Sequence, residues 1–430
     1  MKRKINKLIN SLFPLNRSLA GSNNLKSLLI IKKNIPIKIK RIKSGTKVFD
    51  WKVPHEWNLK GAILKNNNTS KTLIDSKNSN LHVVSYSKPI NKIVKWNELK
   101  KHLHYDKKYE NAIPYRTSYY SNNWGMSVTY KQYQKIKNSK GPYKIIINSS
   151  FKKGYMHYGE LLIKGKSRKE ILISTYICHP SLANDNLSGI IVTNFITEYL
   201  LKKKSLHYSY RIVFHPETIG AIAYSFINKE KIKKIDFGTV ITCTGGKENF
   251  SYKESYNKNH FINYLLLNLF KKKKITQKKY EYDVVGSDER QYSSQGFGIN
   301  IISIFKGKYY EYSNYHLSTD NLNYVTSENL IKSINFHKNF FDLIEKTPIY
   351  QTKNKECEIM LSKYNLYDKL GGGFRPNNKQ LSNQHLYLWM LYLFDGSNTI
   401  EMIAEKLKEK KSKIKKMSEK LLKLKLIYRV

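Results

Sequence analysis

The feature that most constrains the fold is a regular alternation of strand and helix patterns in the middle of the chain. Three apolar, β-branched segments predict strands, at 170–177, 208–216 and 237–244. The segments between them carry helical patterns, at 187–203 and 219–232. Strands that are apolar on both faces and alternate with helices are typical of a mostly parallel sheet with helices on both faces. We therefore expect an α/β domain whose functional groups lie at the carboxyl ends of its strands.

The regions on either side of this alternation have different sequence patterns. Residues 47–127 contain short aromatic and β-branched runs separated by Asn, Pro and Gly, which predict a β-rich inserted domain. The motif GGGFRP at 371–376 is a break, and the three short helical patterns after it predict a winged helix within 360–430. Residues 1–46 are then an N-terminal helical part of the catalytic domain, and 128–350 are its main part.

The composition bears on whether the chain binds nucleic acid or a membrane. The chain carries 77 Lys and Arg against 32 Asp and Glu, a formal charge of +45 that is common in nucleic-acid-binding proteins. Because the excess is spread along the whole chain, a solvated surface is the simpler interpretation, also for Lys413, Lys415 and Lys416 in the C-terminal region. Three cysteines form no even framework, which favours a reducing, cytoplasmic setting. No run approaches the roughly 18 apolar residues of a membrane span.

Polar side chains follow two of the predicted strands directly. His179 and Asp185 lie in ICHPSLANDNLSG after the first strand, and Glu217 lies in HPETIG after the second. Each has a plain explanation when taken alone, because Asp is common in turns and Glu is favoured at helix N-termini. Parallel strands bring their carboxyl ends to one edge of the sheet, so together these residues predict a metal or catalytic site.

Two later stretches interrupt apolar runs with polar side chains. GSDERQY presents Asp288 and Glu289, and YHLSTDNL presents His316. A histidine between Tyr and Leu could equally be a core residue. In the β-rich region the conspicuous aromatic and histidine side chains are more often core than substrate contacts, and we assign none of them to the site: Trp51, His82, Tyr119 and Trp124.

Four motifs in this order, HPSLANDNLSG, PETIG, GSDERQY and YHLSTDNL, resemble the aminopeptidase-like proteins related to the co-catalytic zinc aminopeptidases. Earlier segments such as GTKVFDWKVPHEWN and GYMHYGELLIKGKS resemble the same family, so the resemblance covers nearly the whole chain. It implies zinc as the cofactor, with His179, Asp185 and His316 as ligands and Glu217 as the general base.

The sequence departs from the wider superfamily at two ligand positions. The superfamily places a metal-binding glutamate directly after the base, where this chain has Thr218. It places a metal-binding aspartate where this chain offers Thr242 and Cys243. Either one zinc ion is bound by the three remaining ligands, or Glu217 and the pair Asp288 and Glu289 complete a rearranged site.

These motifs predict a zinc-dependent amide hydrolase that acts on a peptide or another small amide, most simply an aminopeptidase. One alternative is a deacylase acting on an amino-sugar or N-acyl precursor, which the family's common position beside surface-polysaccharide genes suggests. Another is a non-catalytic scaffold whose C-terminal winged helix contacts nucleic acid or protein, which the threonines at 218 and 242 favour.

Overall fold

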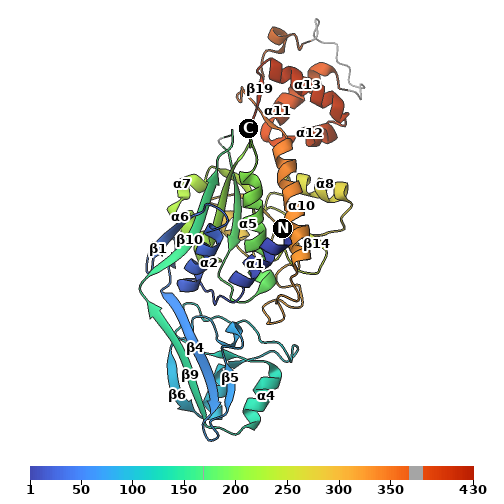
Figure 1. Cartoon of the computed structure of the whole chain (residues 1–430). Coiled ribbons are helices and arrows are strands. Elements are labelled where there is room, and N and C mark those ends of the chain that lie inside the picture. Colours follow the sequence, from blue (N-terminus) through green and yellow to red (C-terminus); the bar gives the residue numbers. More distant parts are fainter. Residues whose placement is uncertain (168, 368–380) are drawn as a thin grey trace. The chain divides into compact units, whose positions relative to one another are not determined.

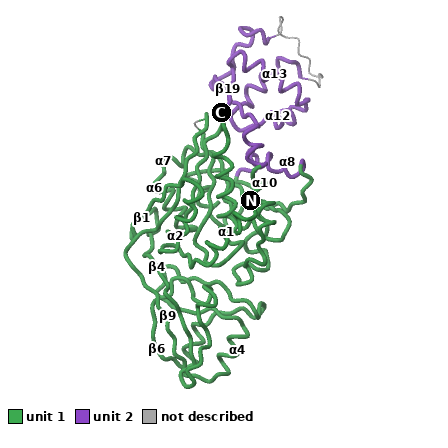
Figure 2. Tube along the Cα trace, in the orientation of Figure 1, with its two compact units in different colours: residues 1–256, 273–338 green, residues 257–272, 339–430 purple. Residues whose placement is uncertain are grey.

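The computed structural model describes residues 1–167, 169–367 and 381–430 (Figure 1). The chain divides into two compact units, of which the first comprises residues 1–256 and 273–338 and the second comprises residues 257–272 and 339–430 (Figure 2). The predicted break GGGFRP at 371–376 lies outside the described residues.

The centre of the first unit is an eight-stranded mixed sheet. Its strands in spatial order are β1 (Lys38–Lys43), β10 (Tyr155–Ile163), β12 (Ser209–His215), β11 (Glu170–Tyr176), β13 (Ile235–Val240), β16 (Asn300–Lys306), β14 (Phe250–Lys253) and β15 (Lys278–Tyr280). The central four, β12, β11, β13 and β16, are parallel, whereas β10 and β14 pair antiparallel with their inner neighbours. The predicted α/β class with a parallel core is confirmed.

The connections around β11 place helices on both faces of the sheet. Helix α5 (Gly189–Leu201) joins β11 to β12, whereas α6 (Ile219–Ile227) and α7 (Lys229–Ile232) join β12 to β13. Because β12 and β13 flank β11 on opposite sides, right-handed crossovers put α5 and α6 on opposite faces. The strand order therefore reverses at β11, and such a reversal opens a crevice at the carboxyl ends of the strands.

Helices from both ends of the unit complete these layers. Helix α1 (Lys2–Leu12) buries Ile5, Leu8, Ile9 and Leu12, the spacing expected for one apolar face. It contacts both α2 (Ser22–Lys32) and α5. The short helix α9 (Glu289–Tyr292) contacts β16 and α6, and α10 (Ser327–Lys346) follows later in the chain.

The β-rich part of the first unit has a four-stranded antiparallel sheet of its own. In spatial order it contains β5 (Thr72–Asp75), β4 (Glu56–Asn66), β9 (Tyr143–Lys152) and β6 (Ile90–Val94). Strand β9 lies beyond residue 127 in the sequence, and α4 (Tyr130–Asn138) precedes it. The pairs β2 (Lys47–Val48) with β3 (Trp51–Lys52) and β7 (Leu103–His104) with β8 (Met126–Ser127) are shorter.

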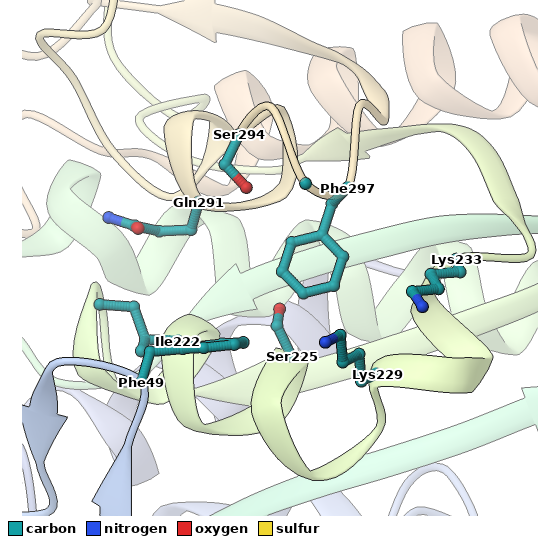
Figure 3. Close-up of a pocket in the computed structure, with 9 residues that line it drawn as sticks. Phe49, Ile222, Ser225, Lys229, Lys233, Gln291, Ser294 and Phe297 are labelled. Atoms are coloured by element: carbon teal, nitrogen blue, oxygen red, sulfur yellow. The ribbon is translucent and has the colours of Figure 1, made fainter.

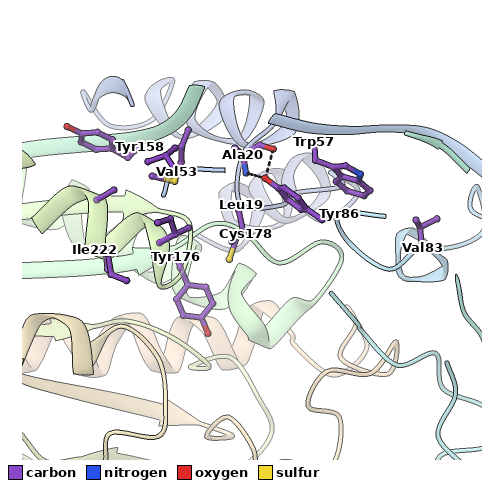
Figure 4. Close-up of a cluster of buried hydrophobic side chains, with 14 of the residues drawn as sticks. Leu19, Ala20, Val53, Trp57, Val83, Tyr86, Tyr158, Tyr176, Cys178 and Ile222 are labelled. Carbon is purple, nitrogen blue, oxygen red and sulfur yellow. Dashed lines mark hydrogen bonds between the residues drawn. The ribbon is translucent and has the colours of Figure 1, made fainter. Parts of the chain in front are cut away.

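One apolar core joins this sheet to the larger one. It contains Trp57 and Val83 from the β-rich part together with Tyr176 at the end of β11 and Cys178 shortly after it (Figure 4). The buried hydroxyl of Tyr86 accepts a hydrogen bond from the backbone N–H of Ala20 at 3.0 Å and donates to the carbonyl of His55 at 2.9 Å. The β-rich part is thus packed against the carboxyl end of β11, which allows it to contribute side chains there.

The second unit has a separate core and a three-stranded sheet in the order β18 (Asp395–Thr399), β17 (Ile349–Thr352) and β19 (Ile427–Arg429). Its helices are α8 (Phe261–Lys273), α11 (Asn383–Leu393), α12 (Ile400–Lys406) and α13 (Lys411–Lys423). From α11 to β19 the order of elements is helix, strand, helix, helix, strand, and the winged helix stays a prediction. In the part of the chain that the structure describes, no helix has the length and apolar character needed to cross a membrane.

Candidate metal centre

Three of the predicted residues meet at the carboxyl edge of the central strands. His179 follows β11, Asp185 lies at a kink before α5 where its own backbone is not helical (φ −107°, ψ 86°), and His316 comes from the segment after β16. Nε2 of His316 lies 3.0 Å from Oδ2 of Asp185, and Nε2 of His179 lies 3.7 Å from the same oxygen. One ligand atom from each residue lies within 4.8 Å of the other two, so a single ion could contact all three.

The donor set fits zinc. Two imidazole nitrogens and one carboxylate oxygen are common zinc ligands, and they leave a fourth tetrahedral position open. Nε2 of His316 is buried and is not aligned for a hydrogen bond with any described group, as expected of a nitrogen that binds a metal. Burial lowers the pKa of His179 to about 4, which keeps the imidazole neutral at pH 7. Burial acts to raise the pKa of Asp185, but the two histidines and Tyr176 outweigh it and bring it to about 2.

The second oxygen of Asp185 is already engaged. Oδ1 accepts a hydrogen bond of 2.5 Å from the hydroxyl of Tyr176, and this hydroxyl lies 2.7 Å from Oγ1 of Thr242. A carboxylate that bridges two metal ions through its two oxygens needs both of them free. The hydrogen bond from Tyr176 occupies Oδ1, which leaves Oδ2 for an ion, and this arrangement favours one ion.

Glu217 lies at the same edge, after β12. Its Oε2 is 3.9 Å from Nε2 of His179, and its Oε1 accepts a hydrogen bond of 2.7 Å from Ser287. Burial, followed by the negative charges of Asp288 and Asp185, raises the pKa of Glu217. A carboxylate with a raised pKa beside a metal site is a suitable general base. A second cluster of potential ligands, Cys178, His179 and Glu217, shows that Glu217 could also reach an ion bound to His179.

Asp288 and Glu289 lie behind Glu217 and belong to neither cluster of potential ligands found among the described residues. Oδ1 of Asp288 accepts a hydrogen bond of 2.7 Å from the backbone N–H of Thr218. Thr218 has a φ of 59°, which is strained for a β-branched residue, and this hydrogen bond helps to hold it. Glu289 accepts hydrogen bonds from Ser303 and from the backbone of Ser287. Both acids therefore support the segment that carries Glu217.

Tyr115 of the β-rich part was missed from the sequence. Its ring centroid lies 5.0 Å from that of His316 and 5.2 Å from that of His179. Its backbone N–H donates to the carbonyl of His316 at 2.7 Å, and its hydroxyl lies 2.8 Å from that of the half-buried Tyr119. His316 has a φ of 54°, so this contact helps to hold a strained backbone at that histidine. The flanking bridge between Pro114 and Leu317 could be found only from the structure.

Arg17 was also missed. Its side chain is fully buried, and no carboxylate among the described residues pairs with it. The guanidinium donates to the carbonyl of His179 at 2.7 Å and to the carbonyl of Leu12 at the end of α1. Burial lowers the pKa of Arg17 to about 10, so it remains charged at pH 7. An arginine in a lysine-rich chain gives no signal that would single it out in the sequence.

A separate pocket of about 470 Å³ lies where α6 meets the turn between β2 and β3 and the segment after α9 (Figure 3). Phe49, Phe297 and Ile222 form its apolar side, and Lys229 and Lys233 lie at its rim. None of the residues predicted for the metal centre lines it, so it is not part of that site.

Comparison with known sequences identifies a family. Residues 6–347 match the family described as "Domain of unknown function (DUF4910)". The chain is 39% identical over 408 residues to a protein of Clostridium acetobutylicum, covering 94% of this chain and 91% of that protein. The relative is named "Putative polysaccharide biosynthesis protein with aminopeptidase-like domain".

Comparison with solved structures confirms the resemblance and the fold. A crystal structure described as "putative peptidase" from Clostridium acetobutylicum matches with a TM-score of 0.80 and 36% identity, covering 100% of this chain and 96% of that one. A zinc aminopeptidase from Bacillus subtilis matches with a TM-score of 0.56 and 12% identity, covering 78% of this chain and 94% of that one. The first unit therefore shares the fold of zinc aminopeptidases.

Proposed function

The chain belongs to the family described as "Domain of unknown function (DUF4910)", and on the geometry of its metal centre we propose that it is a zinc-dependent amide hydrolase. The observation that carries the proposal is the convergence of His179, Asp185 and His316 beside Glu217, a carboxylate that does not belong to the three-ligand set. Three ligands with an open position and a nearby base are the parts that metal-assisted hydrolysis requires.

The proposed roles follow from the position of each side chain. His179, Asp185 and His316 would bind zinc, which supplies a Lewis acid and lowers the pKa of a bound water to about 7. Glu217 takes a proton from the attacking water and delivers it to the leaving nitrogen. The hydroxyl of Ser287 donates to Oε1 of Glu217 and so orients the carboxylate, leaving Oε2 toward His179.

Two forms of this activity share the same chemistry. An aminopeptidase is suggested by the zinc aminopeptidases of similar fold. A deacylase that removes an acyl group from an amino-sugar or another N-acyl precursor is suggested by the polysaccharide biosynthesis in the name of the Clostridium acetobutylicum relative. They differ in whether a charged amine lies next to the scissile carbonyl.

The experiment that tests the proposal compares wild type with Glu217→Gln on a panel of aminoacyl and N-acyl amides, with zinc content measured in parallel. Glutamine can still accept the Ser287 hydrogen bond but cannot take a proton, so we expect zinc to be retained and hydrolysis to fall by roughly 10²- to 10⁴-fold. If zinc is lost together with activity, Glu217 is a ligand, and Asp288 or Glu289 becomes the candidate base.

Complete inactivity of the zinc-loaded wild type would instead favour a non-catalytic scaffold. The C-terminal helices would then be the candidate contact for nucleic acid or protein. Binding of DNA that disappears when salt is added would reflect only the excess of lysine. A cytoplasmic location is retained as a prediction from the unpaired cysteines, of which Cys178 and Cys243 are buried.

A further inference from the structure

The substrate class depends on which charged groups the site can offer to the atoms around the scissile amide. Among the described residues, four buried carboxylates lie beside the proposed ligands or the segment that carries Glu217: Asp185, Asp288, Glu289 and Asp320. All four have an exposed fraction of 1% or less, whereas the side chain of Glu217 is 25% exposed. Of these five acids, Glu217 is the one that a substrate can reach.

Two of the buried acids have their oxygens occupied at the metal centre itself. Asp185 accepts from Tyr176 on Oδ1 and turns Oδ2 to the two histidine ligands. Asp320 accepts from the backbone of Asn184 at 2.7 Å on Oδ1, and from the backbone of Asp185 and the hydroxyl of Tyr312 on Oδ2. Neither acid has an oxygen to spare for a substrate.

The other two buried acids accept hydrogen bonds from other residues of the protein. Asp288 holds the backbone of Thr218. Glu289 accepts a hydrogen bond of 3.2 Å from Tyr309, whose hydroxyl accepts one of 3.0 Å from the ammonium of Lys253. Lys253 is only 2% exposed, so Glu289 already balances a buried cation of the protein.

An aminopeptidase substrate brings an ammonium group on the carbon next to the scissile carbonyl. Removing an ammonium from water is costly unless a carboxylate pairs with it. Among these five acids that partner would have to be Glu217, whose Oε1 already accepts from Ser287 and whose Oε2 faces His179, so an ammonium and the attacking water would compete for the same carboxylate. The positive charges of zinc and of the buried Arg17 behind His179 oppose an ammonium further.

The reachable surface beside the metal centre is aromatic. The ring of Tyr315 stacks on that of His316 with centroids 3.9 Å apart, and the ring of Tyr310 lies 5.0 Å from that of Tyr315. Tyr310 is 59% exposed. These rings extend from a metal ligand to the surface and offer contact area to an uncharged group.

We infer that the preferred substrate is an amide whose acyl group carries no positive charge, rather than a peptide with a free N-terminus. This inference rests on the proposed function. In the reaction the water oxygen bonds to the carbonyl carbon, the C–N bond breaks, and the proton accepted by Glu217 passes to the leaving nitrogen. The products are a carboxylic acid and an amine.

The test uses the zinc-loaded full-length chain and two chromogenic amides that differ at one position. Phenylalanine 4-nitroanilide carries the α-ammonium, and 3-phenylpropanoyl 4-nitroanilide has hydrogen in its place. We expect kcat/KM at pH 7 to be at least about tenfold higher for the uncharged amide, since a desolvated and unpaired charge costs several kcal/mol. The ratio should narrow above pH 8, where the amine of the first compound loses its proton.

A binding measurement separates this inference from catalysis. Phenylalanine hydroxamic acid and 3-phenylpropanohydroxamic acid both bind zinc, and calorimetry on the zinc-loaded chain should show at least about tenfold tighter binding of the uncharged one. Equal or tighter binding of the charged hydroxamic acid would overturn the inference even if hydrolysis is observed. Tighter binding of the uncharged compound without hydrolysis of either anilide would support the inference and count against the proposed function.

Discussion

Replacing Arg17 tests whether the N-terminal helices control the metal centre. The guanidinium joins the carbonyl of His179 to the carbonyl of Leu12, and it is the only hydrogen-bond donor to the His179 carbonyl among the described residues. Arg17→Met keeps most of the apolar stem and removes both hydrogen bonds. Arg17→Lys keeps the charge but cannot span two carbonyls in the same planar geometry.

Two opposing effects set the expected magnitude. Hydrogen bonds from a charged group contribute roughly 1.5–3 kcal/mol each, so losing two removes about 3–6 kcal/mol. Arg17 is fully buried and pairs with no carboxylate in the described part of the chain, and removing such a charge returns a desolvation cost of several kcal/mol. We therefore expect the free energy of unfolding of the Met variant to change by no more than about 2 kcal/mol. Metal affinity has no such compensation and should fall by roughly 10- to 100-fold, the usual effect of losing a group that orients a ligand.

The assay is a zinc titration against a competing chelator, combined with thermal unfolding of the metal-free proteins. The variants should order as wild type, Arg17→Lys and Arg17→Met in zinc affinity. If zinc affinity is unchanged in both variants while the metal-free proteins unfold at lower temperature, Arg17 only stabilises the fold, and its contact with the His179 carbonyl has no role in metal binding.

Two further predictions concern the metal centre. The purified wild type should hold about one zinc per chain, and His179→Ala and His316→Ala should each lose most of it, because only one carboxylate and one imidazole would remain. The matched control is His337→Ala, which removes a buried histidine outside the site and should leave the zinc content unchanged; unchanged zinc in both site variants would exclude the assigned ligands. Burial raises the pKa of Asp288 to about 7 in the folded protein, whereas the value in the unfolded chain is near 3.9. Between these two pH values the folded metal-free protein keeps a proton on Asp288 that the unfolded chain has lost. The free energy of unfolding therefore decreases as the pH rises through this range. Denaturant unfolding of Asp288→Asn should therefore show the variant gaining stability relative to wild type from about pH 4 to about pH 7, and a constant difference would mean that Asp288 is ionised throughout.

The sequence was sufficient to predict the central architecture because each strand there can be recognised from a short stretch of consecutive residues. The apolar residues of β11 and β12 are buried on both faces, so each strand appears as a continuous apolar run followed by turn residues. The same rule locates His179 and Glu217, since each follows a strand directly. His316 was found through its motif, because the segment that carries it is not a strand or helix.

The contacts that shape the site could not be predicted, because they join residues distant in the chain. The hydroxyl that engages Asp185 belongs to Tyr176, which appears in the sequence as one more apolar strand residue. Tyr115 reaches the site only because the β-rich part packs against the end of the large sheet. Strand β9 belongs to the smaller sheet because it pairs with β4 and β6. The sequence of β9 shows that it is a strand but does not show which sheet it joins.

The pairing of the β-rich part with the His316 segment has a consequence for the order of folding. The backbone N–H of Ile113 donates to Ser318, and that of Ser318 donates to the carbonyl of Ile113, across 205 residues of chain. Contacts at such separation form slowly, because closing a long loop costs entropy before the contact is made. A ribosome must also synthesise almost three quarters of the chain before His316 exists. Zinc capture should therefore follow formation of the central sheet, both during synthesis and when the denatured protein is returned to native conditions.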